Sequence, residues 1–376
     1  MFDNKTLCLN MIVKNEAHII EKTLTNLCQY FHFDYWVIAD TGSHDGTQEV
    51  IQNFFMSKNI VGELVEHSWR DFAFNRNKSL DVAFDKTDYI LFWDADEKMC
   101  GNFEIPLPFD SKMYYLKKDI GVSYSVPLLV SNRIHWKYVG VLHEYLMNLE
   151  PISLHEKCWV EGDYYIHHDA NGASHFDNDK YENHGKILEA AMIDENDKEL
   201  CARYAFYCAQ SFKDAGNNEK AIQWYTHVAE GNINWSQERY YSYLQLGKLY
   251  YERNNILEAI KYMEYGIKID EERPECISYL MEYYYSCKMH SSVMAWFLYF
   301  KEKNKNPMMR YMNHDNKLFL DSSRIYYVYY FVSISAYYDN DFLEGKKALT
   351  FLIENITSIP NFMHNIIIEN KKFYDM

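Results

Sequence analysis

Several features that mark large classes of protein are missing from the sequence. No stretch approaches the roughly 18 uninterrupted apolar residues of a membrane-spanning helix, so we expect no transmembrane anchor. The first residues, Met1 to Lys5, carry no signal-peptide pattern and run straight into a predicted strand. The eight cysteines form no CxxC pair and no paired metal-ligand spacing, which is typical of reduced thiols in the cytosol. These absences predict a soluble cytoplasmic protein.

Positive charge is also scarce. The 376 residues contain 38 Lys and Arg against 54 Asp and Glu, which gives a formal net charge of −16. Such a field repels a phosphate backbone, so we expect no nucleic-acid partner. An anionic sugar nucleotide is still compatible with this charge, provided that a metal ion offsets it locally. The length is sufficient for one or two domains, each with a core of its own.

The first 100 residues alternate between strand and helix patterns. Apolar runs at 7–13, 35–39, 61–65 and 89–93 read as strands, with amphipathic helical stretches between them, the last at 71–84. This alternation predicts a parallel sheet with crossover helices, hence an α/β layer. From about 113 to 168 the pattern changes to strands without long helices, which we place at 113–116, 124–130, 133–138 and 159–167. We expect these strands to extend the layer into a mixed sheet.

After about residue 180 the sequence is continuously helical and repeats itself. Ala259 follows Ala221 by 38 residues, and Val293 follows Ala259 by 34 residues, the period of tetratricopeptide repeats. Stacked helix pairs that bury Tyr and Leu would also account for the 34 tyrosines without a ligand. We therefore predict two domains, an α/β domain over 1–178 and an all-α helical-repeat domain over 179–376. The concave face of such repeats can bind a peptide, mediate a homodimer, or serve only as a buttress.

Two acidic segments follow predicted strands of the α/β domain. Residues 37–47 read Val-Ile-Ala-Asp-Thr-Gly-Ser-His-Asp-Gly-Thr, and residues 91–97 read Leu-Phe-Trp-Asp-Ala-Asp-Glu. The carboxyl ends of parallel strands meet in the crevice where open α/β sheets bind nucleotides. Two carboxylates one residue apart in a strand point the same way and can hold a divalent cation, which in turn holds a diphosphate. Asp40, Asp94 and Asp96 are therefore the candidate binding residues.

This pairing resembles the sugar-nucleotide site of family 2 glycosyltransferases with the GT-A fold, over residues 5–170. The opening Leu-Asn-Met-Ile-Val-Lys-Asn-Glu (9–16) is similar to the first strand and turn of that family, and Trp69 to Lys78 resembles the start of its helix before the Asp-x-Asp strand. The resemblance implies that Asp96 ligates Mn²⁺ or Mg²⁺, with Asp94 at the ribose or the metal. It also implies a set of nucleotide-sugar contacts: Asn15, Glu16, Asp40, Arg76, Asn77 and Asp94.

Two further segments carry candidates for catalysis and metal binding. Trp136 to Tyr145 resembles a His-Glu segment of relatives with helical repeats, and an inverting transfer needs a base beside the acceptor hydroxyl. Glu144 is the candidate base and His143 the second candidate, although better-known members place the Asp of a Glu-Asp pair here. The His167-His168 pair ends the last predicted strand, where one of the two could bind metal, because neighbouring strand residues face opposite ways. Packing or surface histidines are the alternative.

Together these patterns predict a metal-dependent, inverting glycosyltransferase. The resemblance favours a UDP-sugar donor, with glucose or N-acetylglucosamine as the sugar, and a protein or glycan acceptor. One alternative is a non-catalytic repeat scaffold with a degenerate nucleotide-binding domain, although the four candidate carboxylates argue against it. Another is a nucleotidyltransferase, but residues 7–16 contain no glycine for a phosphate-binding loop.

Overall fold

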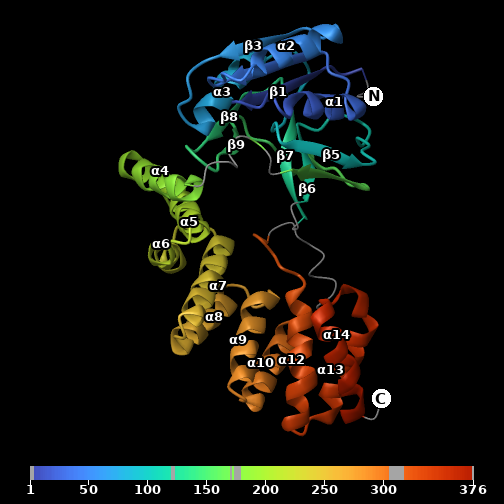
Figure 1. Ribbon diagram of the computed structural model, residues 1–376, viewed down its shortest axis with the longest axis vertical. Coiled ribbons are helices and arrows are strands. Elements are labelled where there is room, and N and C mark those ends of the chain that lie inside the picture. Colours follow the sequence, from blue (N-terminus) through green and yellow to red (C-terminus); the bar gives the residue numbers. More distant parts are fainter. Residues whose placement is uncertain (1–3, 120–122, 170–171, 173–178, 305–316, 375–376) are drawn as a thin grey trace. The chain divides into compact units, whose positions relative to one another are not determined.

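The computed structural model describes residues 4–119, 123–169, 172, 179–304 and 317–374 (Figure 1). Contacts divide the chain into two compact units, Met1–Ala191 and Met192–Met376, and the division falls inside helix α4 (Lys180–Asp194). The first unit contains a mixed sheet, and the second consists of helix pairs. Among the described helices, none combines the length and the apolar character that crossing a bilayer requires.

A nine-stranded sheet organises the first unit. Its strand order is β3-β2-β1-β4-β7-β6-β11-β5, and β10 pairs with β6 beside this path. Strands β1 to β4 are parallel, β7 runs antiparallel to β4, and a separate hairpin pairs β8 with β9. The strands are β1 Leu7–Val13, β2 Tyr35–Asp40, β3 Gly62–Glu66, β4 Tyr89–Phe92, β5 Glu97–Gly101, β6 Met113–Asp119, β7 Ser123–Ser131, β8 Trp136–Val139, β9 Tyr145–Asn148, β10 Lys157–Trp159 and β11 Tyr164–His168.

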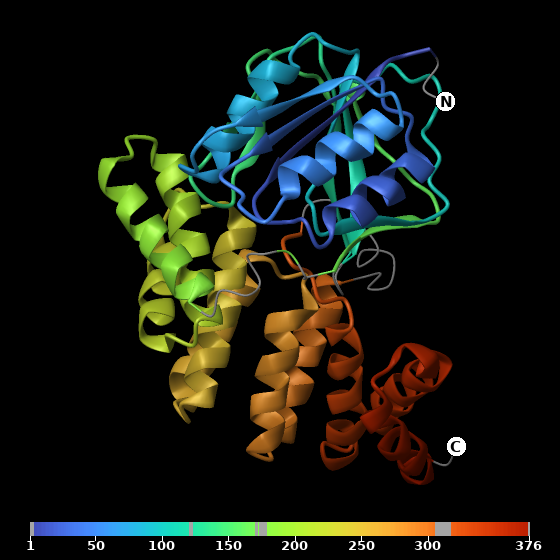
Figure 2. The same cartoon turned by 45° about the horizontal axis from the view of Figure 1, so that its top comes forward.

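Alternate residues of the central strands enter two cores on opposite faces of the sheet, as the two-residue period of a strand requires. Leu7 and Leu9 belong to the core covered by α1 (Ile20–Tyr30) and α2 (Thr47–Ser57), which lie on one face in Figure 2. Cys8 belongs to the other core, covered by α3 (Phe72–Ala83) and β8. The buried Asn10 also faces α3, because its amide donates to the Ser79 hydroxyl at 2.9 Å. These helices fix the strand ends that carry the site.

The mixed sheet confirms the predicted fold class, but two predictions about its strands are wrong and two strands were missed. The expected strand at 159–167 is two strands, β10 and β11, separated by a turn at Gly162 with φ 136°. Strands β5 and β9 were not predicted. The expectation that Asp94 and Asp96 lie in a strand is also wrong: β4 ends at Phe92, and both residues lie in the turn to β5, where the Glu97 amide donates to the Asp94 carbonyl at 3.2 Å.

Asp88 ties the start of β1 to the start of β4. Its carboxylate accepts from the Thr6 amide and hydroxyl, both at 2.9 Å, and from Arg133 at 3.0 Å. The Thr6 amide hydrogen bond, with the hydroxyl and the Arg133 charge, outweighs partial burial and lowers the pKa of Asp88 to about 2. A folded-state pKa below the ordinary value of 3.8 contributes stability above about pH 4 that is lost as the pH falls toward 2.

We therefore expect Asp88→Asn to lower the free energy of unfolding by about 1–2 kcal/mol at pH 7. The difference from the wild type should shrink steadily from about pH 4 downward, because both side chains then become neutral. Urea denaturation between pH 7 and pH 3 measures it. Asp85→Asn is the matched control, since Asp85 contacts the same Arg133 but is 64% exposed. A constant difference across this pH range would contradict the linkage.

The second unit repeats one helix-turn-helix geometry. The pairs are α5 Lys198–Asp214 with α6 Asn218–Glu230, α7 Ser236–Glu252 with α8 Ile256–Ile269, α9 Pro274–Ser286 with α10 His290–Lys303, and α12 Arg324–Tyr338 with α13 Phe342–Glu354, followed by α14 Asn361–Asn370. Short 3-10 helices lie at Leu154–Glu156, Ile356–Ser358 and Lys371–Phe373. The predicted repeat positions Ala221, Ala259 and Val293 are fully buried between helices. This packing explains the sequence period, because a small residue at each position lets neighbouring helices approach closely.

Each pair turns through a residue in the left-handed region followed by a helix cap. The left-handed residues are Gly216, Asn254, Lys288 and Asn340, with φ between 58° and 77°. In three pairs the next residue caps the second helix, because Asn217, Asn255 and Asp341 each accept from the amide three residues on. In the third pair the cap position holds Met289, whose side chain makes no such bond. The first turn of α10 therefore lacks a cap that its equivalents have.

Met289→Asp should raise the free energy of unfolding by about 1 kcal/mol, because a carboxylate at this position can accept from the first-turn amides and favours the helix N-terminus. Urea denaturation followed by circular dichroism measures the gain. Met289→Ala removes the same side chain without supplying a cap, and it should not stabilise the protein. Equal stability of the Asp and Ala variants would show that the cap contributes nothing here.

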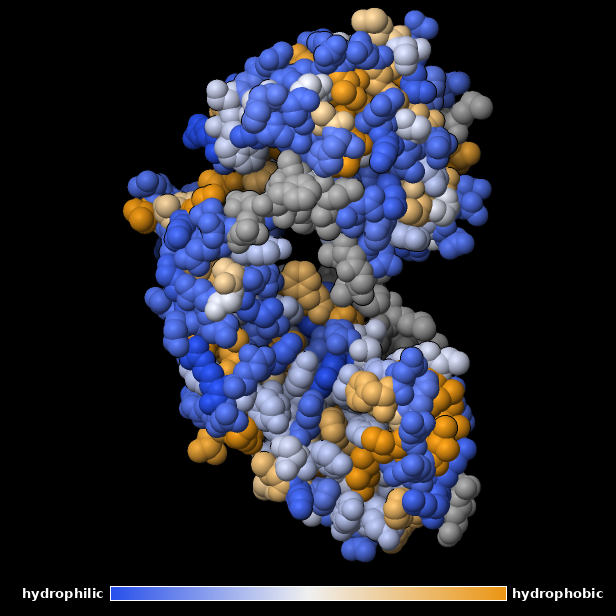
Figure 3. All heavy atoms as spheres, viewed as in Figure 1, coloured by the Kyte–Doolittle hydropathy of each residue, from blue (hydrophilic) through white to orange (hydrophobic). Residues whose placement is uncertain are grey.

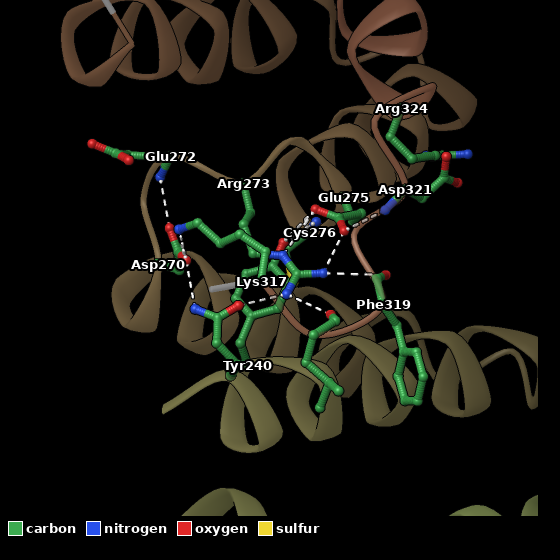
Figure 4. A network of polar contacts seen from close by, with 12 residues as sticks. Tyr240, Asp270, Glu272, Arg273, Glu275, Cys276, Lys317, Phe319, Asp321 and Arg324 are labelled. Carbon is green, nitrogen blue, oxygen red and sulfur yellow. Dashed lines mark hydrogen bonds and ion pairs between the residues drawn. The ribbon is translucent and has the colours of Figure 1, made fainter. Parts of the chain in front are cut away.

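A buried ion pair anchors the residues that precede α12. The side chains of Arg273 and Glu275 are 1% and 2% exposed, and Figure 4 shows the polar groups around them. Arg273 donates to the carbonyl of Leu318 at 2.9 Å, and Glu275 accepts from the Asp321 amide at 3.0 Å. The Arg273 guanidinium also lies 4.1 Å from the Tyr240 ring centroid. Residues 318–321 are thus fixed on α7 and α9, which sets the start of the last helix pair.

Hydrophobic side chains remain exposed on the C-terminal helices, where Figure 3 shows orange atoms gathered on the surface. Phe362 and Ile366 lie one turn apart on α14 and are 67% and 40% exposed, while Met363 and Ile367 pack inward. Leu343 on α13 is 65% exposed. Together these side chains form an exposed apolar surface on α13 and α14.

Candidate functional site

The predicted site residues gather at one edge of the sheet. In the register of the parallel strands Val13 lies opposite Asp40, and Asn10 lies opposite Phe92, so β1, β2 and β4 end on the same side. Asp40 is the last residue of β2, and the turn that contains Asp94 and Asp96 follows β4. This edge is the position at which open α/β sheets bind their ligands.

Asp40 is buried, and only one of its two carboxylate oxygens accepts hydrogen bonds from the described residues. Its Oδ1 accepts from the amides of Gly42 at 2.9 Å and Ser43 at 2.8 Å, which closes the turn after β2. Gly42 permits this turn because its φ is 103°. The Oδ2 atom is buried and has no hydrogen-bond partner in the described part of the chain. A buried carboxylate oxygen without a donor is costly, so Asp40 has one acceptor available for a ligand N–H or O–H.

Asn15 and Glu16 connect the turn after β1 to the turn after β2. Asn15 has φ 58°, its amide donates to the Ser43 hydroxyl at 2.8 Å, and its side-chain oxygen accepts from the His44 amide at 3.0 Å. The Glu16 amide donates to the Thr47 hydroxyl at 2.8 Å. The described contacts of these two residues thus hold the two turns together beside Asp40.

The Arg76 guanidinium contacts two carboxylates, Asp94 and Glu144. Its Nη2 lies 2.8 Å from Asp94 Oδ1, and its Nε lies 2.6 Å from Glu144 Oε1. Burial opposes ionisation of Asp94, but the charges of Arg76 and Lys118 outweigh it and lower the pKa of this carboxyl to about 2. Burial also disfavours the charge of Arg76, and the two carboxylates nevertheless raise its pKa well above the ordinary value. Asp94 and Arg76 are therefore a charged pair at neutral pH.

Asp96 lies beside one of the two candidate histidines. Its Oδ1 is 3.5 Å from His168 Nδ1, whereas His167 Nε2 lies 3.4 Å from Asp169 Oδ1. The two histidines differ because neighbouring residues of β11 face opposite ways. Within the described residues no group of three or more His, Cys, Asp and Glu side chains could hold a metal ion.

The remaining two candidates contact the protein itself. The Asn77 side chain donates to the Tyr138 carbonyl at 2.9 Å and accepts from its amide at 2.7 Å, which fixes α3 to β8. His143 has φ 55°, and its ring lies edge-on to that of His184 on α4, with centroids 6.5 Å apart. Asn77 thus supports the strand that leads to Glu144, and the ring of His143 contacts α4.

Sequence analysis missed a second ion pair next to the Asp-x-Asp turn. Glu97 is 4% exposed and pairs with Lys118, while its Oε2 has no hydrogen-bond partner among the described residues. Burial, together with the charge of Asp94, raises the pKa of Glu97 to about 7. Glu97 directly follows Asp96 in the sequence, so its position was visible. Nothing in the sequence pairs it with Lys118, which β6 brings in from 21 residues away.

Two family matches agree with this geometry. Residues 8–99 match glycosyl transferase family 2, and residues 159–269 match the N-terminal tetratricopeptide domain of SusR. The family 2 match lies within the first unit and covers strands β1 to β4. The match contains Asp40, Arg76, Asp94 and Asp96, and it confirms the resemblance drawn from the sequence motifs. The chain therefore joins a GT-A-like mixed sheet to a helical-repeat region of the tetratricopeptide type.

Parts of the chain are similar to solved structures, among them glycosyltransferases and a tetratricopeptide repeat protein. TarS of S. aureus, in complex with UDP-GlcNAc, is 13% identical over 70% of this chain and 91% of its own, with a TM-score of 0.33. The mannosyltransferase PcManGT of Pyrobaculum calidifontis, in complex with GDP-Man and Mn²⁺, is 12% identical over 70% and 86%, with a TM-score of 0.34. A tetratricopeptide repeat protein of Parabacteroides merdae is 14% identical over 52% and 66%, with a TM-score of 0.36. No curated protein sequence gives a significant match.

Proposed function

We propose that the protein is a metal-dependent, inverting glycosyltransferase that moves a sugar from a UDP-sugar to a protein or glycan acceptor. The observation that carries the proposal is the meeting of Asp94 and Glu144 on Arg76, within a family 2 domain. This places a carboxylate of the Asp-x-Asp turn beside a carboxylate suited to act as a base. Inverting transfer needs both, one on the donor side and one on the acceptor side.

Glu144 is proposed as the base. Its side chain is 12% exposed, Arg76 holds Oε1, and no hydrogen bond to Oε2 occurs in the described part of the chain. In a single displacement, Oε2 takes the proton of the acceptor hydroxyl as the acceptor oxygen bonds to the anomeric carbon. The bond from that carbon to the diphosphate oxygen breaks, and UDP leaves with the electron pair. His143 is the second candidate for the proton.

Asp96 and His168 are proposed as the protein ligands of Mn²⁺ or Mg²⁺. A carboxylate and an imidazole within 3.5 Å of each other suit Mn²⁺, and diphosphate oxygens and water can complete the coordination. Asp94 contributes charge beside them, and His167 stays a weaker candidate because it lies against Asp169. When bound, the cation would offset the charge that develops on the departing diphosphate.

The nucleotide is proposed to contact the turns after β1 and β2. Asp40 Oδ2, buried and without a donor, can accept from the uracil N–H or a ribose hydroxyl. Asn15 and Glu16 line the same two turns, and Asn77 acts through β8. UDP-glucose and UDP-N-acetylglucosamine are the favoured donors. The helical unit is proposed to bind the acceptor or to form a homodimer, and its exposed apolar surface on α13 and α14 supports the latter.

A panel of sugar nucleotides tests this proposal by thermal shift on the full chain. A ligand that binds only the folded state raises the melting temperature by mass action. We expect one UDP-sugar, with Mn²⁺, to raise it by several degrees, and the same sugar nucleotide without metal to raise it much less. GDP-mannose and ATP are the matched controls: both carry a nucleobase other than uracil, and ATP carries no sugar on its terminal phosphate. No shift with any sugar nucleotide, with or without metal, would overturn the proposal.

A further inference from the structure

The Arg76 side chain is held by several contacts within the protein itself. It is 14% exposed and comes from α3, a helix that packs against β1, β2 and β8 in the core of the unit. The guanidinium carbon lies over the Tyr138 ring, 5.4 Å from its centroid. The protein therefore already contacts two of its nitrogens and its central carbon.

The two carboxylates that Arg76 contacts come from distant parts of the sequence. Asp94 lies 18 residues after it in the turn that follows β4, and Glu144 lies 68 residues after it, directly before β9. Nε and Nη2 belong to one edge of the planar guanidinium, so the oxygens that they bind must lie side by side. Without the positive charge of the Arg76 guanidinium these two carboxylates would repel each other.

We infer that Arg76 is a positioning residue that fixes the donor-side carboxylate, Asp94, relative to the proposed base, Glu144, rather than a ligand of the nucleotide. The inference rests on the proposed function for its catalytic consequence and on the ion-pair geometry alone for the bridge itself. A base displaced by about 1 Å from the reacting hydroxyl can lose about 10²-fold in rate. A lysine keeps the charge but has no planar fork, so it cannot hold both carboxylates in this relation.

The catalytic test compares Arg76→Lys and Arg76→Ala with the wild type, using UDP-glucose and UDP-N-acetylglucosamine with Mn²⁺. Arg76→Lys should lower the turnover number about 10²-fold and leave the dissociation constant of the donor within about threefold. Guanidinium ion at tens of millimolar should restore part of the turnover of Arg76→Ala. Arg70→Lys is the matched control, because Arg70 is 69% exposed and, among the described residues, contacts Asp71 and the Phe74 ring. Donor affinity lost tenfold or more at unchanged turnover would overturn the inference in favour of a nucleotide ligand.

A second test needs no donor, so it separates this inference from the proposed function. In the wild type, Asp94→Asn removes a partner of Arg76 and should lower the melting temperature. In the Arg76→Ala background the same change relieves the repulsion between Asp94 and Glu144, so it should raise the melting temperature. An equal decrease in both backgrounds would show that Arg76 does not bridge the two carboxylates, whatever the protein catalyses.

Discussion

Asp96→Asn should abolish donor turnover while leaving the fold intact. A cation held by Asp96 and His168 would offset charge on the departing UDP by several kcal/mol, and about 1.4 kcal/mol corresponds to a factor of ten in rate. We therefore expect a loss of at least about 10³-fold in kcat/KM at saturating Mn²⁺. Release of UDP from the UDP-sugar measures it, and circular dichroism reports the fold.

The matched control for this prediction is Asp169→Asn. Asp169 lies at the same edge of the sheet, contacts His167 and Lys98, and is 34% exposed, so it shares charge and surroundings but not the proposed role. It should change turnover by less than threefold. Equal losses of turnover in the two variants would mean that turnover depends on the total negative charge at this edge of the sheet. They would contradict a specific role of Asp96 as a metal ligand.

Glu144→Gln should lose turnover and keep donor binding. The amide oxygen can still accept from Arg76, so the ion-pair geometry is replaced by a hydrogen bond of similar shape. A glutamine cannot take the acceptor proton, and loss of a general base typically costs about 10²–10⁴-fold in kcat. The donor dissociation constant should stay within about threefold, because Glu144 is proposed to act on the acceptor hydroxyl and not on the donor. Calorimetry and UDP release measure the two quantities.

Azide provides the decisive control for the role of Glu144. It attacks as an anion and needs no deprotonation, so it should accelerate UDP release by Glu144→Gln and leave the wild type nearly unchanged. Glu150→Gln, an exposed glutamate on the same segment, should behave as the wild type. If azide does not accelerate the variant, Glu144 has a structural role and His143 becomes the leading candidate for the base.

Most of the fold could be predicted because its strands are short apolar runs with turns between them. The strand at Leu7–Val13 was predicted to the residue, since its burial on both faces leaves an apolar run that only Asn10 interrupts. Strand β9 was not predicted, because hydrophobic residues occupy its exposed positions and the usual alternation is lost: Tyr145 is 38% and Met147 is 36% exposed. Strand β5 begins with the buried Glu97, which reads as part of the acidic turn.

The site could be predicted as a set of residues but not as a complete set of pairs. Asp40, Asp94 and Asp96 were visible because carboxylates at strand ends have a chemical meaning that does not depend on partners. Glu144 was not visible as the second partner of Arg76, beside Asp94, because β8 brings it there from 68 residues away. The Asn77 amide that fixes β8 reads only as part of the same motif as Arg76. Long-range ion pairs depend on the packing of whole elements, which local patterns do not encode.

The most direct test of the proposed transferase is the release of UDP from UDP-glucose and UDP-N-acetylglucosamine by the full chain, with and without Mn²⁺. The proposal predicts Mn²⁺-dependent release from one of the two donors, reduced at least about 10³-fold in Asp96→Asn. A folded protein that binds neither donor and releases no UDP under either condition would contradict it, and the helical unit would then be the functional part of the chain.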